Sequence, residues 1–247
     1  MASPHPGYVK HRVLRIVPAR AQHKTAAHCQ FEVDGILTDT GNQASYLEDW
    51  IDRHCYAVGA DGKVDRERWK IREMGLDCEF NQPGQVVLVQ MAVDGGHELS
   101  YHCPDRQFPN AIRRVLACPD VKKVGKEVWS ADGRKLHLAG VNHVRGFCDI
   151  APLWVLYQQH VNNRNVREAD CPGLEALAEE FLGWSIKVGH EGHWARHVVL
   201  EDREIEYAAM DAIASLEVWK ELKRRLPPLA AEIHEHVTLM EMHHNQR

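Results

Sequence analysis

The order of the expected strands and helices from residue 75 onward constrains the fold most strongly. Strand composition is found at 75–81, 85–93, 97–102, 121–125 and 146–150. Helical spacing is found at 109–118, 131–139, 173–182 and 201–226. Asp94-Gly95-Gly96 is a turn signal, so the first three strands are expected to form consecutive antiparallel hairpins. Strands that then alternate with helices predict an α/β fold with a mixed sheet, three antiparallel strands plus parallel ones, flanked by α-helices.

The charge of the chain is unevenly distributed. Its net charge of −5 is made up of +5 in residues 1–25, which contain no acid, and −10 in the remainder. We therefore expect a basic N-terminal arm at 1–25 and one globular domain at 26–247. A solvated tail is the favoured interpretation of the arm, ahead of a transit peptide or a phosphate-contacting arm. An acidic body that meets a polyanion needs a local basic surface or bridging cations.

Composition also excludes several classes of protein. No stretch approaches the roughly 18 apolar residues of a membrane span, so we expect no membrane partner. The seven cysteines are odd in number and contain no C-x-x-C pair, which argues against a disulfide framework or a structural zinc site. Reduced thiols indicate an intracellular, reducing compartment: nucleus or cytoplasm, with an organelle matrix as the alternative.

Two carboxylates lie two positions apart on the first expected strand. Asp77 and Glu79 therefore project from the same face. Paired carboxylates resist burial unless a cation neutralises them or water reaches them. A divalent metal site and a wet edge strand both satisfy this requirement.

Three more side chains are candidates by position. Tyr207 and Asp211 are four apart on the last expected helix, hence on one face, with small neighbours that allow close approach to the sheet. Asp132 opens another expected helix, where an acid ordinarily acts as a cap. Each pattern alone is common in surface helices; their combination with Asp77 and Glu79 is not.

Taken together, these segments resemble the DEDDy 3'→5' exonucleases, the family of RNase D and Werner-type exonucleases. The first motif is matched by Gly-Leu-Asp77-Cys-Glu79-Phe followed by Val-Leu-Val-Gln90-Met-Ala, the second by Lys-Val-Gly125 through Asp132, and the third by Tyr207-Ala-Ala-Met-Asp211-Ala. The similarity covers 70–225 in family order, and 28–56 is more weakly similar to plant Werner-like members. The resemblance implies a ribonuclease H-like fold.

It also implies a chemistry. Two divalent cations, Mg²⁺ or Mn²⁺, would be held by Asp77, Glu79, Asp132 and Asp211, and Tyr207 would orient the attacking water. The enzyme would release 5'-mononucleotides stepwise from the 3' end of DNA and/or RNA. The resemblance further implies substrate contacts at Leu76, Phe80, Gln90 and Met91. A basic cluster around the second motif suits phosphate contact or a solvated rim equally; its members are Lys122, Lys123, Lys126, Arg134 and Lys135.

One departure from the family pattern concerns Asp132. It stands one residue later than the second motif leads us to expect, which indicates a one-residue insertion and makes Glu127 the alternative ligand. Histidines at His190, His193 and His197, and a second group beyond residue 233, are interpreted as surface residues rather than zinc ligands.

Two alternatives remain beside the exonuclease. The insertion and the acidic body favour a catalytically weak module that binds nucleic acid ends or a protein partner. The same carboxylates could also serve a hydrolase of another phosphoester. The sequence leaves the oligomeric state open.

Overall fold

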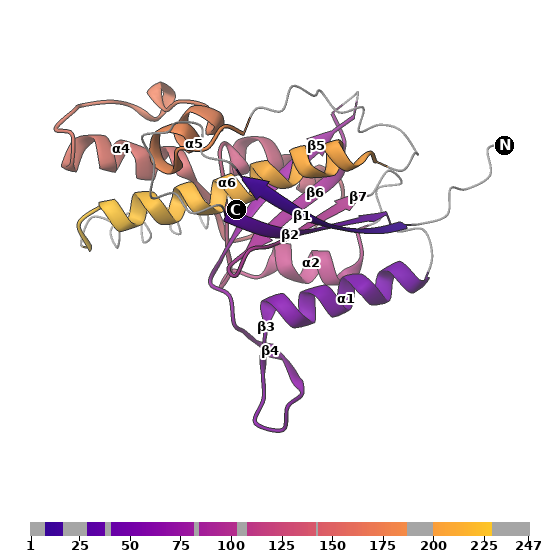
Figure 1. Cartoon of the computed structure of the whole chain (residues 1–247). Helices are drawn as coiled ribbons and strands as arrows, with labels where there is room; N and C mark the ends of the chain where they lie inside the picture. The colour runs from indigo at the N-terminus through magenta and orange to yellow at the C-terminus, as the bar shows by residue number, and fades with distance from the viewer. Residues whose placement is uncertain are drawn as a thin grey trace.

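The structure is a computed structural model, and it describes residues 8–16, 29–37, 41–81, 84–102, 108–141, 143–186 and 200–228. A central twisted sheet with helices on its two faces makes up the described part of the chain (Figure 1). The expected histidine groups at 190–197 and beyond 233 lie outside these residues.

Five strands of the sheet come from the motif-bearing segment. β5 (Glu73–Phe80), β6 (Val86–Val93) and β7 (His97–His102) are consecutive and antiparallel. β8 (Lys122–Gly125) pairs with β5 in parallel, and β9 (Phe147–Asp149) pairs with β8 in parallel. The predicted mixed sheet of three antiparallel strands plus parallel strands is therefore confirmed, and it matches the ribonuclease H-like arrangement.

Two further strands extend the sheet beyond β7. β2 (Cys29–Leu37) pairs with β7 in parallel, and β1 (Tyr8–Ile16) pairs with β2 antiparallel, which gives the order β1-β2-β7-β6-β5-β8-β9. Nine residues of the expected basic arm thus form the edge strand of the sheet. A basic segment can form an edge strand, because edge strands often contain charged residues, which discourage pairing with a further strand.

Helices cover the sheet on both faces. α6 (Asp202–Arg225) packs on β5, β6 and β7, and it is joined by α4 (Ile150–His160) and α5 (Leu174–Leu182) around one hydrophobic cluster. α1 (Gly41–Cys55) and α2 (Asn110–Ala117) share the second cluster on the opposite face (Figure 1). Smaller elements are a π-helix at Val128–Gly133, α3 (Arg134–Leu138) and a 3₁₀ turn at Glu168–Asp170.

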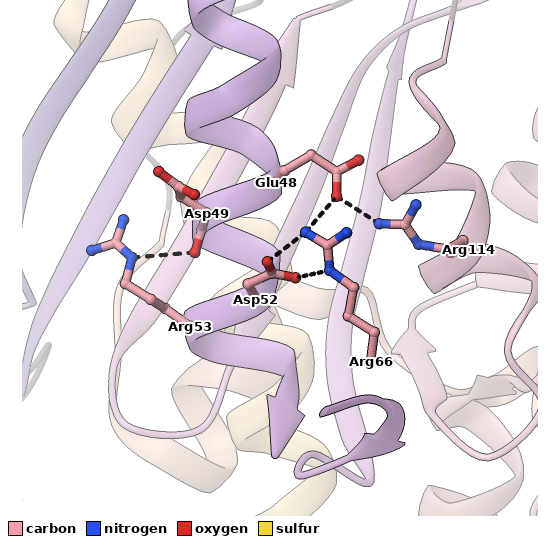
Figure 2. Close-up of polar contacts among 6 residues, drawn as sticks. All are labelled: Glu48, Asp49, Asp52, Arg53, Arg66 and Arg114. Carbon is pink, nitrogen blue, oxygen red and sulfur yellow. Dashed lines mark hydrogen bonds and ion pairs between the residues drawn. The ribbon is translucent and has the colours of Figure 1, made fainter. Parts of the chain in front are cut away.

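A two-stranded hairpin projects from the end of α1 (Figure 1). It consists of β3 (Tyr56–Val58) and β4 (Val64–Trp69), which pair antiparallel. An isolated hairpin is marginally stable in water. Figure 2 shows what holds this one: Arg66 donates to both carboxylate oxygens of Asp52, at 2.9 and 2.6 Å, and Arg114 of α2 donates to Glu48 at 2.6 Å. Arg66 also lies 3.6 Å from Glu48, so the ion pairs join hairpin, α1 and α2.

The helices and cysteines of the described residues bear on membrane spanning and on disulfides. None of the described helices has the length and apolar character that a membrane span requires. The described cysteines, Cys55, Cys78, Cys118, Cys148 and Cys171, are all free thiols.

Candidate active site

Three carboxylates from two elements meet on the α6 face of the sheet. Asp77 and Glu79 project from β5, and Asp211 projects from α6; each offers an oxygen, and these oxygens lie within 4.8 Å of one another. The alternation of side chains along a strand places the first two together, and the packing of α6 across that face adds the third. A group of three carboxylate oxygens of this size suits a hard divalent cation.

A close contact between backbones brings Asp211 to the strand. A Cβ atom at Gly75 would lie 1.9 Å from the carbonyl oxygen of Ala212, so only glycine fits at this point. The helix residue at this contact, Ala212, is itself small and fully buried. Gly75 on β5 and Ala212 on α6 therefore allow Asp211 to come close to Asp77.

The cluster is strongly unfavourable for negative charge. Burial raises the pKa of Glu79 to about 8, with Asp211 adding to the effect, and burial raises the pKa of Asp211 to about 6. The pKa of Asp77 lies well above its usual range because of burial and then the charges of Asp132, Asp211 and Glu79. Carboxyl groups in such surroundings either hold protons at neutral pH or need a bound cation. The donor set, all carboxylate oxygen, fits Mg²⁺ or Mn²⁺ and does not suit a soft metal.

Asp132 lies beside this group although it is not one of the three. It is 3% exposed, and its pKa is raised to about 8, first by burial and then by Glu79 among other carboxylates, while Lys135 opposes the rise. It sits in the π-helix Val128–Gly133. A π-helical turn holds one more residue than an α-helical turn, which is how a single inserted residue is accommodated. The insertion inferred from the sequence thus coincides with a backbone feature that keeps Asp132 near Asp77.

Glu127, the alternative ligand, points elsewhere. It precedes the π-helix in the left-handed conformation, with φ 59°, and its side chain is 68% exposed. Its carboxylate lies 3.3 Å from the Lys126 ammonium. Of the two acids considered for the second motif, Asp132 is the one that the structure buries with the cluster.

Tyr207 lies one helical turn before Asp211 on the same face of α6. Its side chain is half-buried, and its pKa is raised to about 12 by burial and then by Asp211, Glu79 and Asp77. The phenol therefore keeps its proton at neutral pH. It can hydrogen-bond and orient a water molecule, but it cannot serve as a general base there.

The expected substrate-contacting residues fall into two groups. Leu76 and Met91 are fully buried in the hydrophobic cluster on the α1 side of the sheet, and Gln90 is also fully buried, so none of the three presents surface to a nucleotide. The substrate contact expected of them does not fit this burial. Phe80, which follows Glu79, is partly exposed, and the Lys135 ammonium lies 3.3 Å from the centre of its ring.

One lysine of the expected basic cluster is a core residue. Lys123 is fully buried, and its ammonium donates to the backbone oxygens of Cys118 and Val121. Burial lowers its pKa to about 7. Contact with phosphate is unavailable to Lys123, whereas Arg134 is exposed and Lys135 is partly exposed beside the cluster. Alternation along the expected strand places Lys122 and Lys123 on opposite faces, but the sequence does not indicate which of the two is buried.

Asp149, at the end of β9, is a further acid near the cluster that was not among the expected site residues. Its carboxylate accepts the Ala151 backbone N–H at 2.9 Å and thereby caps α4. Its charge also contributes to the raised pKa of Asp132. The sequence alone does not place Asp149 near Asp132. Their proximity follows from the parallel pairing of β8 and β9.

Comparison with known proteins identifies the family and supports the fold. A family model described as "3'-5' exonuclease" matches residues 64–227. Among solved structures, Brucella melitensis NrnC bound to pGG has a TM-score of 0.56 at 18% identity, covering 68% of this chain and 80% of that chain. The Aedes aegypti Nibbler EXO domain has a TM-score of 0.60 at 17% identity, covering 82% and 94%. Brucella melitensis NrnC with bound Mg²⁺ has a TM-score of 0.51 at 17% identity, covering 69% and 87%. No curated protein sequence matches the chain significantly.

Proposed function

Because the chain belongs to the 3'-5' exonuclease family, we propose that it hydrolyses DNA and/or RNA stepwise from the 3' end in a reaction that requires Mg²⁺ or Mn²⁺. The observation that carries the proposal is the meeting of Asp77, Glu79 and Asp211 within 4.8 Å, with Asp132 buried alongside. These residues span all three motifs. The matched family region, 64–227, contains every one of them.

The side chains divide the chemistry between them. Asp77, Glu79, Asp132 and Asp211 would hold two divalent cations, which would supply an activated water and stabilise the leaving 3' oxygen. Tyr207 would hydrogen-bond the attacking water and fix its direction, since its raised pKa keeps the phenol protonated. The products would be 5'-mononucleotides.

Substrate would approach over the end of β5. Phe80 follows Glu79 directly, and its partly exposed aromatic ring would give a base an apolar contact at this end of the strand. Lys135, which lies over that ring, is close enough to Asp132 to lower its pKa, and it would meet a phosphate of the substrate. NrnC has been solved with pGG and with Mg²⁺. A short guanine-containing nucleic acid and Mg²⁺ are therefore suitable first probes for this chain.

The test is release of mononucleotides from single-stranded DNA and RNA, measured by chromatography with Mg²⁺, Mn²⁺ or EDTA. We expect metal-dependent release by the wild-type protein and none by Asp77→Asn. The exposed Asp120 supplies a matched control, Asp120→Asn, which should retain full activity. Activity of Asp77→Asn, or activity in EDTA, would refute the proposal.

The role of Asp132 is tested by a pair of variants. Asp132→Asn should lose activity, because it removes a buried carboxylate beside the cluster, whereas Glu127→Gln should retain it, because that side chain faces solvent. The reverse result would assign the second-motif ligand to Glu127.

If no mononucleotide is released in any condition, the protein would instead be a catalytically weak module that binds nucleic acid ends or a protein partner. Tight binding of oligonucleotide 3' ends with no turnover at any concentration of Mg²⁺ or Mn²⁺ would establish it. Preferential cleavage of a small phosphodiester over an oligonucleotide would instead establish a different phosphoester hydrolase.

A further inference from the structure

Gln90 is a buried amide whose hydrogen-bonding groups are both unused. Its side chain is fully buried in β6, and neither the amide nitrogen nor the amide oxygen has a hydrogen-bond partner among the described residues. A buried polar group without a partner is destabilising, and most such groups in proteins are paired. An amide left in this condition next to a functional cluster calls for a partner that becomes available when the cluster is occupied.

The register of the sheet places Gln90 directly beside Asp77. The two residues are opposite one another in the antiparallel β5–β6 pair, so their side chains leave the same face of the sheet. Directly opposed residues have Cβ atoms about 4.5–5.5 Å apart, a distance that a glutamine side chain spans easily. Gln90 is therefore the residue of β6 that lies directly opposite Asp77 in the cluster.

On its other side Gln90 meets a fixed polar pair. Ser100 lies opposite Gln90 in the β6–β7 pair, and the Ser100 hydroxyl donates to a carboxylate oxygen of Glu98 at 2.9 Å. The serine oxygen keeps lone pairs but has no second proton to donate. Asp77, Gln90 and Ser100 thus form a continuous polar row across three strands, and the amide has two N–H groups with an acceptor side chain on each side.

We propose that Gln90 is a positioning residue for Asp77: its amide donates to the Asp77 carboxylate when the cluster holds divalent cations, and so fixes the orientation of that carboxylate. The inference rests on the function proposed above. It assigns no contact between Gln90 and substrate, in agreement with the full burial of the side chain. Partners of this kind orient metal ligands, and their loss typically weakens metal binding by roughly 10- to 100-fold.

The decisive variant is Gln90→Met, which keeps the volume and removes the amide. Metal-free protein should be as stable as wild type or more stable in urea, because an unpartnered amide has been removed. Mn²⁺ binding, followed by calorimetry without substrate, should weaken by about 10- to 100-fold. These opposite directions distinguish positioning from packing, since a residue needed only for packing would lower stability and leave the Mn²⁺ dissociation constant unchanged. Gln90→Leu provides a second apolar replacement if the methionine variant folds poorly.

A second buried amide provides the matched control. Gln158 is buried in α4, and its amide oxygen accepts an N–H of Asn162 at 3.0 Å. Gln158→Met should lower the stability of the metal-free protein and leave Mn²⁺ binding unchanged, the opposite of Gln90→Met in both respects.

The outcomes separate this inference from the proposed function. Suppose that the wild-type protein binds Mn²⁺ and degrades oligonucleotides. The positioning role is then wrong, while the exonuclease function stands, if Gln90→Met binds Mn²⁺ within twofold of the wild type. It is also wrong if Gln90→Met is less stable than the wild type in EDTA. If wild-type protein neither binds Mn²⁺ nor cleaves, the proposed function itself fails. Weakened Mn²⁺ binding with retained or increased metal-free stability supports the inference.

Discussion

Replacing Glu79 by glutamine removes a carboxyl group that the folded protein keeps protonated to an unusually high pH. Burial, with Asp211 nearby, raises the pKa of this group from 4.5 to about 8. Between these two values the native state binds a proton that the unfolded state has released. The free energy of unfolding of the metal-free wild type therefore falls as the pH rises through this window. Glutamine does not titrate, so Glu79→Gln escapes this loss.

The size of the effect follows from the shift. One pKa unit corresponds to about 1.4 kcal/mol, so a rise from 4.5 to about 8 sets an upper limit of about 5 kcal/mol on the stability that the wild type loses. Glu79 keeps part of its surface exposed, and water and counter-ions there screen the carboxylate. We expect Glu79→Gln to exceed the wild type by about 2–3 kcal/mol at pH 8.5 and to match it closely at pH 5.

Urea denaturation in EDTA at pH 5, 7 and 8.5 measures this difference, with Glu127→Gln as the control because that carboxylate faces solvent. Saturating Mn²⁺ at pH 8.5 should then stabilise the wild type strongly and Glu79→Gln much less. A Glu79→Gln protein that is no more stable than the wild type at pH 8.5 in EDTA, or a difference that does not vary with pH, would refute the electrostatic reasoning.

Three other substitutions test separate parts of the structure. Gly75→Ala should destabilise the protein by about 3 kcal/mol, seen in urea denaturation, and reduce activity, because its Cβ would lie 1.9 Å from the Ala212 carbonyl oxygen and push α6 away from β5; a fully active, stable variant would contradict the close contact. Tyr207→Phe should lower kcat roughly 10²-fold with unchanged Mn²⁺ affinity, because the phenol orients water and holds no cation; a comparable loss of Mn²⁺ binding would contradict this role. Burial lowers the pKa of Lys123 from 10.5 to about 7, so the free energy of unfolding of the wild type should rise relative to that of Lys123→Met between pH 7 and 10.5, by at most about 5 kcal/mol. A difference between the two unfolding free energies that is constant with pH would show that the ammonium titrates normally.

The strands that carry the motifs and the last helix were predictable from the sequence, whereas α4 was not expected. The five strands expected between residues 75 and 150 agree with β5 to β9 within two residues at each end, because apolar runs and the Asp94-Gly95-Gly96 turn report local structure directly. α6 was likewise recognised from its helical spacing. The insertion before Asp132 could be counted in the sequence, but its form as a π-helix depends on how the backbone packs against β9.

What the sequence could not predict depends on long-range pairing. The charge of 1–25 predicted a basic arm. The pairing of β1 with β2 is a contact between separate segments, which composition does not reveal. The β3–β4 hairpin is held by Arg66 and its partners on α1, a contact between distant segments that local patterns do not encode. Leu76 is a different case, because its alternation with Asp77 and Glu79 along β5 already put it on the other face of the strand, where it is buried with Met91.

The direction of attack is the central claim, and it is tested most directly by comparing one oligonucleotide labelled at its 5' end with the same oligonucleotide labelled at its 3' end, in Mg²⁺ or Mn²⁺. The account predicts a ladder of progressively shorter fragments from the 5'-labelled strand and, from the 3'-labelled strand, immediate release of labelled mononucleotide with no ladder. Both patterns should be absent for Asp77→Asn. A ladder from the 3'-labelled strand, internal fragments from either strand, or intact substrate throughout would contradict it.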